Sequence, residues 1–98
     1  MQYELRWSPD AVDHLAGLTA QQRTTVVDQS ELHLRNQPEQ PTKKRKLLRE
    51  NPLATWELRV GRLRVLYNID TEDKAVEIVA VGIKDRNRLL IGGEEIEL

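Results

Sequence analysis

The stretch "TWELRVGRLRVLYNID", residues 55–70, decides the fold of this chain. Apolar and polar side chains alternate through both of its halves, which predicts two strands that each bury one face. Gly61 separates the two halves and predicts a tight turn between them. We therefore expect a β-hairpin whose Trp56 and Tyr67 side chains point toward a core.

The same alternation places charged side chains together on the opposite face of the hairpin. These side chains are Glu57, Arg59, Arg62 and Arg64. Glu57 is expected to form a salt bridge with Arg64 or Arg59. Because Arg64 points away from the core, Arg64→Ala is expected to change the free energy of unfolding by no more than about 1 kcal/mol.

A strand and two helices are predicted before the hairpin. Residues 2–7 are rich in strand-forming side chains. Ser8, followed by proline, is a helix N-cap, and Gly17 ends that short helix. Thr19 and the glutamine three residues later form a capping box, which starts a second helix that reaches about Asn36. The two helices should form an αα-hairpin.

The remaining predictions concern the buried face of the second helix and the segments that follow the hairpin. Val26, Val27, Ser30 and Leu34 share one face of the helix. "AVEIVAVGI", residues 75–83, is apolar on both faces except at Glu77, as expected of a central strand. Gly82 ends its clean pattern, and Gly92-Gly93 predicts a turn before a short extended segment. The resulting fold class is α+β with the order βααβββ, an antiparallel sheet with a helical hairpin packed on one face.

Composition limits the class of protein. A chain of 98 residues is long enough for one small domain, 1–98, and too short for two. It contains no cysteine, no apolar run of membrane-spanning length and no signal-peptide pattern. We expect a soluble, cytoplasmic protein without a membrane partner. His14 and His33 lie in the helices, away from any acidic cluster, so we expect packing or surface roles and no metal site.

The net charge of -1 hides a strong asymmetry along the chain. Positive side chains are concentrated in the middle, at Lys43, Lys44, Arg45, Lys46, Arg49, Arg59, Arg62 and Arg64. Negative side chains are concentrated in the last third, at Asp70, Glu72, Asp73, Glu77, Glu94, Glu95 and Glu97. A local cluster of cations on one face favours contact with a polyanion.

"WELRVGRLRVLYNID", followed after a short interval by "VAVGIKDRNRL", resembles the RelE/ParE toxin superfamily of bacterial type II toxin–antitoxin modules. The resemblance covers almost the whole chain. Its most specific part is leucine-arginine, a glycine-containing turn and arginine-x-x-tyrosine, here Leu58-Arg59, Gly61 and Arg64 to Tyr67. A leucine- and basic-rich stretch precedes it, here Lys46-Leu47-Leu48-Arg49.

The resemblance implies one of two activities. RelE-like members cut mRNA in the ribosomal A site without a metal ion or cofactor. ParE-like members share the fold but inhibit DNA gyrase and lack the nuclease residues. Members of both kinds are held inactive by a small antitoxin. The expected partners are therefore an antitoxin together with the ribosome and mRNA, or alternatively DNA gyrase.

The resemblance also implies roles for individual residues. Arg64 matches a catalytic arginine of the RelE-like nucleases, and Lys84 stands where a second one is expected. Thr55 and Glu57 replace two lysines, and Glu57 is a candidate base for the ribose 2′-hydroxyl. Leu90 replaces a tyrosine that stacks on an mRNA base. These replacements keep open the alternatives of gyrase inhibition or a nuclease of weakened activity.

The remaining site prediction is a set of cations that hold the RNA backbone. Its members are Lys43, Lys44, Arg45, Lys46, Arg49, Arg62 and Arg86. Together with Arg64, Lys84 and Glu57 they form the predicted site of an mRNA endonuclease.

Overall fold

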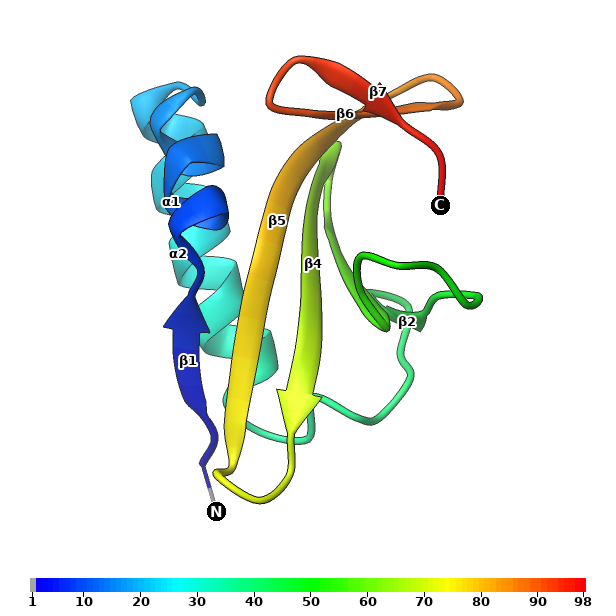
Figure 1. Ribbon diagram of the computed structural model, residues 1–98. Helices are drawn as coiled ribbons and strands as arrows, with labels where there is room; N and C mark the ends of the chain where they lie inside the picture. Colours follow the sequence, from blue (N-terminus) through cyan, green and yellow to red (C-terminus); the bar gives the residue numbers. More distant parts are fainter. Residues whose placement is uncertain (1) are drawn as a thin grey trace.

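A computed structural model describes residues 2–98 and shows two helices packed on one face of a seven-stranded sheet (Figure 1). In chain order the elements are β1 (Glu4–Trp7), α1 (Pro9–Ala16), α2 (Ala20–Leu34), β2 (Arg45–Leu47), β3 (Trp56–Val60), β4 (Leu63–Asp70), β5 (Ala75–Asp85), β6 (Arg88–Ile91) and β7 (Glu94–Ile96). The predicted α+β class, with a helical hairpin over one sheet face, is confirmed.

Both helices begin where their capping residues predict. The Ser8 hydroxyl accepts a hydrogen bond from Ala11 N at 3.0 Å, and Gly17 follows the last residue of α1. Thr19 and Gln22 form the reciprocal capping box at the start of α2. These bonds satisfy backbone N–H groups that have no partner inside a helix. α2 ends at Leu34, slightly before the predicted end.

The sheet has the strand order β2-β3-β4-β5-β6-β7, and all neighbours in this order are antiparallel. β1 lies outside this order and pairs with β5 in parallel. The predicted hairpin is β3–β4, with Gly61 at φ 58° in its turn. The structure differs from the prediction in two respects: β2 and β6 were not predicted as strands, and β5 continues two residues past the predicted 75–83, to Asp85.

A β-bulge in β5 changes which side chains share a face. Leu66 pairs with Ala80 and Tyr67 pairs with Ile78, so Val79 has no partner on β4. Before the bulge, Ile78 faces the helices; after it, Val81 faces them instead. The side chains of Ala80 and Lys84 consequently lie on the face opposite the helices.

The larger core fills the space between the helices and the sheet. It includes Trp56 and Tyr67, as the alternation predicted, and their rings stack with centroids 6.1 Å apart. The Tyr67 hydroxyl donates to Pro38 O at 2.8 Å, and burial raises the pKa of Tyr67. Val27 was predicted on the buried face of α2 but is 37% exposed, because Val26 occupies that face.

A second, smaller core lies on the opposite face of the sheet. Its buried residues are Ala54, Leu66, Ala80, Leu89 and Ile91. The β6–β7 hairpin folds over this face, and the end of the chain points toward the loop between β2 and β3 (Figure 1). This second core fixes the position of the last residues, because Ile96 and Leu98 pack against it.

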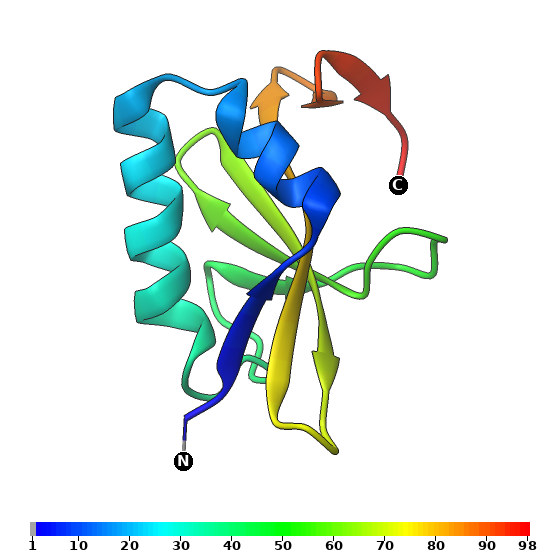
Figure 2. The same ribbon diagram turned by 60° about the vertical axis from the view of Figure 1, so that its left-hand side comes forward.

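Two residues, Gly82 in β5 and His14 in α1, lie where the β6–β7 hairpin begins to fold over the sheet. A Cβ atom at Gly82 would lie 2.6 Å from Leu90 O, so only glycine lets β6 cross so closely. Pairing with β1 ends at Ile78 and pairing with β6 begins at Gly82. Between them, Val81 N donates to His14 Nδ1 of α1 at 3.2 Å. Figure 2 shows α1 and the β6–β7 hairpin at the same end of the sheet.

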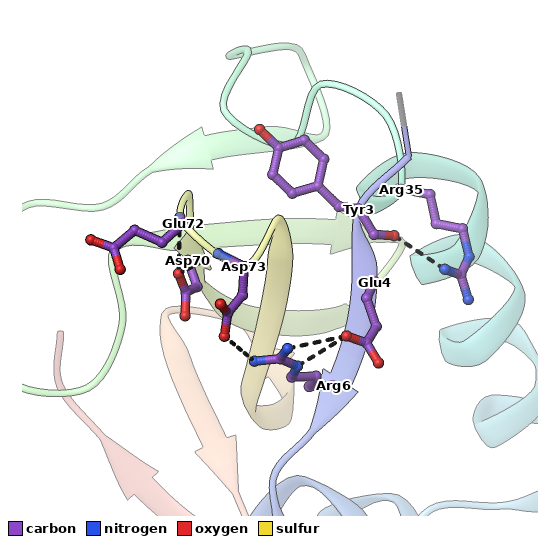
Figure 3. A network of polar contacts seen from close by, with 7 residues as sticks. All are labelled: Tyr3, Glu4, Arg6, Arg35, Asp70, Glu72 and Asp73. Carbon is purple, nitrogen blue, oxygen red and sulfur yellow. Dashed lines mark hydrogen bonds and ion pairs between the residues drawn. The ribbon is translucent and has the colours of Figure 1, made fainter.

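Exposed polar contacts join β1, α2 and the β4–β5 turn at the other end of the sheet (Figure 3). Arg6 forms ion pairs with Glu4 at 3.1 Å and with Asp73 at 3.4 Å. Arg35 donates to Tyr3 O at 3.1 Å. Pairs this exposed contribute little free energy but define the geometry of the strand ends. Neither helix in the described part of the chain is long and apolar enough to span a bilayer.

Candidate functional site

A groove of about 540 Å³ lies on the sheet face opposite the helices. β3, β4 and β5 form its floor. The β6–β7 hairpin and residues 95–98 border one side, and the start of the β2–β3 loop borders the other. The β5 bulge places Lys84 on the groove side, and β6 crosses closely at Gly82 of the same strand.

The groove has an excess of positive charge. Its cationic side chains are Lys46, Arg49, Arg59, Arg64, Lys84 and Arg88, and its acidic side chains are Glu57, Glu95 and Glu97. Six cations and three carboxylates leave three positive charges in excess. The clustering predicted from the sequence therefore produces a positive groove, although the net charge of the chain is -1.

Glu57 and Arg64 form an ion pair in the floor of the groove. Arg64 Nε lies 2.9 Å from Glu57 Oε1, and the two side chains are only 13% and 12% exposed. The Nε–H is not aligned on the carboxylate, so this contact is ionic rather than a linear hydrogen bond. Arg64 Nη1 donates to Gly61 O at 2.7 Å and to Leu63 O at 2.8 Å.

The surroundings of Arg64 differ from the expected exposed site. Burial lowers the pKa of Arg64 and the nearby Arg59 lowers it further, whereas Glu57 raises it. Only 13% of the Arg64 side chain is exposed, so Arg64 is not the surface residue that the expected stability change assumed. The predicted salt bridge to Glu57 is confirmed.

Lys84 lies in the same groove as Arg64, as the resemblance implied. Regular alternation along β5 would have put Lys84 on the same face as Ile78, which is the helix side, because their positions differ by six. The bulge at Val79 reverses that parity. The third predicted catalytic residue, Glu57, is also in the groove, so the fold brings the three together.

The predicted backbone-binding cations do not all lie in the groove. Lys46 and Arg49 line it, whereas Lys43 and Lys44 lie in a bend outside it. Arg45 is on the other face of the sheet, where it donates to His33 O at 2.8 Å and Gln40 O at 2.9 Å. It closes the end of α2 instead of facing the groove.

Arg62 and Arg86 lie in turns, outside the groove lining. The Arg62 side chain is 74% exposed and reaches Asp85 at 3.8 Å. Arg86 is exposed at φ 58°. Thr55 and Leu90, which also depart from the family pattern, are outside the lining.

The groove is also lined by polar and charged side chains that the predicted site omitted. These are Arg59, Asn87, Arg88, Glu95 and Glu97. The hairpin alternation already placed Arg59 on this face and was the available signal for it. Nothing local marks the other four, because they reach the groove only when the β6–β7 hairpin folds over the sheet.

Residues 94–98 approach the groove from the side of β7. Arg49 Nε and Nη2 donate to Leu98 O at 3.3 and 3.1 Å. Glu95 and Glu97 line the groove, whereas Glu94 does not. Among the described residues, no group of three His, Asp or Glu side chains is placed to hold a metal ion.

Comparison with known proteins identifies the family. A family model described as the ParE toxin of the type II toxin–antitoxin system parDE matches residues 5–88. The chain is similar to the toxin–antitoxin complex RelBE2 from Mycobacterium tuberculosis, with a TM-score of 0.75 and 28% identity over 86% of this chain and 93% of that chain. It shares its fold with an archaeal RelE–RelB complex from Pyrococcus horikoshii OT3, with a TM-score of 0.69 and 21% identity over 88% and 99% of the two chains.

No curated protein matches the sequence. The family model nevertheless spans most of the chain, and the resemblance to the RelE/ParE superfamily is confirmed. The chain belongs to the ParE toxin family of type II toxin–antitoxin systems.

Proposed function

We propose that this toxin binds mRNA in the groove and cuts it on the ribosome. The observation that carries the proposal is the excess of six cationic over three acidic side chains in one groove. A phosphodiester backbone is the abundant polyanion that such a groove fits, and its affinity should depend strongly on salt.

The proposed reaction uses the ribose 2′-hydroxyl of the RNA as nucleophile. The 2′-oxygen bonds to the adjacent phosphorus, and the bond from phosphorus to the 5′-oxygen of the next nucleotide breaks. The products are a 2′,3′-cyclic phosphate and a 5′-hydroxyl. Glu57 accepts the proton of the 2′-hydroxyl, and Lys84 gives one to the leaving oxygen. Cations in the groove stabilise the charge that develops on the phosphate.

A second candidate is inhibition of DNA gyrase without catalysis. The observation that favours it is the closed Glu57–Arg64 pair, in which Arg64 is also held by two backbone carbonyls. An arginine so occupied has fewer donors for a scissile phosphate. The family model that matches the chain is also that of ParE toxins.

Induction of the toxin in cells that lack the antitoxin separates the two candidates. Primer extension on cellular mRNA should show cuts aligned with codons if the toxin is a nuclease. Intact mRNA together with DNA damage and filamentation would reject the nuclease and support gyrase inhibition. Glu57→Gln, which keeps the shape of the side chain, should slow cleavage if the carboxylate is the base.

An antitoxin is the proposed protein partner, because both similar structures are complexes of a toxin with an antitoxin. The outer strands β2 and β7 leave backbone groups at the two ends of the strand order, and such edges accept an added strand. Co-expression with a small neighbouring open reading frame should yield a complex that elutes as one species. Separate elution of the two proteins at micromolar concentration would reject this partner.

A further inference from the structure

Arg59 and Arg64 lie directly opposite each other on β3 and β4. Like charges in directly opposite positions of a strand pair destabilise it. One carboxylate, Glu57, lies beside them and pairs with Arg64. The two arginines and Glu57 therefore leave one positive charge on the floor of the groove.

The two arginines differ in what they can offer a ligand. Arg64 is nearly buried, and its donors reach Glu57, Gly61 O and Leu63 O. Arg59 is exposed and lines the groove, and its side chain forms no hydrogen bond or ion pair with any residue from 2 to 98. The free guanidinium presents its planar set of donors to the groove, a geometry that matches two oxygens of a phosphate.

Lys84 supplies a second free cation beside this position. It lines the same groove, and its side chain has no hydrogen-bond or ion-pair partner among residues 2–98. Arg59 is on β3 and Lys84 is on β5, with β4 between them. The β5 residue opposite Arg64, in line with Arg59, is Gly82. A phosphate bound by both Arg59 and Lys84 would lie above Arg64. Its negative charge would offset the repulsion between the two arginines, Arg59 and Arg64.

We propose that Arg59, with Lys84, is the direct phosphate contact of a bound phosphodiester chain, and that Arg64 is a positioning residue that neutralises Glu57. This assignment rests on the proposed binding of RNA in the groove. Removal of Arg64 alone would expose the Glu57 carboxylate to the phosphate and repel it. The effect of Arg64 on binding would therefore act through Glu57.

Fluorescence anisotropy with a short labelled single-stranded RNA tests this assignment on the purified full chain. Arg59→Gln should weaken binding by about tenfold at low salt, and the slope of log affinity against log salt should fall by about 0.7, the value for one lost contact to a single strand. Lys74→Gln is the matched control, because it removes one positive charge from the β4–β5 turn at the far end of β5.

A double-mutant cycle distinguishes positioning from direct contact. If Arg64 acts through Glu57, the double variant Glu57→Gln/Arg64→Gln should bind RNA as tightly as Glu57→Gln alone, within about twofold. A tenfold loss relative to Glu57→Gln would instead make Arg64 a direct contact. Thermal unfolding of each variant confirms that the compared proteins are folded.

The outcomes separate this inference from the proposed function. Equal binding by Arg59→Gln and Lys74→Gln, or no RNA binding by the wild type at low salt, would overturn the inference even if induction cuts cellular mRNA. Binding that depends on Arg59, with cellular mRNA left intact, would support the inference and reject the nuclease.

Discussion

Arg64→Ala should lower the free energy of unfolding by about 3 kcal/mol. Removal of one partner from a buried ion pair costs about 3–5 kcal/mol, because the other charge stays buried without compensation. Glu57 and Arg64 retain 12% and 13% exposure, which places the cost at the lower end of that range. For a domain of this length, each kcal/mol corresponds to about 4–8 °C, so the melting temperature should fall by about 12–24 °C.

Chemical and thermal denaturation of two further variants checks the cause of this loss. Replacement of both partners, as Arg64→Met with Glu57→Gln, should recover most of the stability because no unpaired charge remains. Arg62→Ala should change the unfolding free energy by less than about 0.5 kcal/mol, since that arginine is 74% exposed and its pair with Asp85 spans 3.8 Å. A loss below about 1 kcal/mol for Arg64→Ala, or no recovery in the double variant, would refute the reasoning.

Three other predictions concern parts of the molecule outside this ion pair. Gly82→Ala should destabilise the protein by at least about 1–3 kcal/mol in thermal unfolding, because the new Cβ would lie 2.6 Å from a carbonyl oxygen of β6. Glu95→Gln with Glu97→Gln should raise RNA affinity by more than the square of the factor seen for Glu94→Gln, since only the first two line the groove. A factor equal to that square would mean that each charge acts equally and only net charge matters. Burial and, to a smaller extent, the charges of Lys44 and Arg45 lower the pKa of His33 below 6.5. As the pH falls, His33 is protonated in the unfolded chain before it is protonated in the folded chain, so the free energy of unfolding falls. His33→Gln should therefore flatten the pH dependence of stability measured by denaturation down to about pH 5.

The fold could be predicted from the sequence largely because its signals are local. The N-caps at Ser8 and Thr19 and the alternation around Gly61 each act within a few residues. β2 escaped prediction because it has three residues and depends on pairing with β3 rather than on its own composition. The same dependence hid the true position of Arg45, whose partners are backbone carbonyls in and after α2.

The candidate site could be predicted only in part, because its geometry depends on contacts between distant segments. Arg64 and Glu57 follow from the hairpin pattern, but their burial depends on the groove walls. Lys84 was placed by family resemblance, and residue alternation alone would have assigned it to the wrong face. Glu95 and Glu97 reach the groove only through the fold of the last hairpin.

The bulge at Val79 determines how insertions and deletions in β5 would act. Val79 has no partner on β4, so its deletion would place Ala80 directly after Ile78. Regular alternation would then leave every paired residue of β5 on its present face. Insertion of one residue directly after Ala80, with the bulge kept at Val79, would instead move Val81 and Ile83 from the helix-packed core toward the groove and Lys84 toward the core. β5 can therefore lose one residue at the bulge and keep both faces, whereas one residue inserted after the bulge would exchange the side chains that face the helices with those that face the groove.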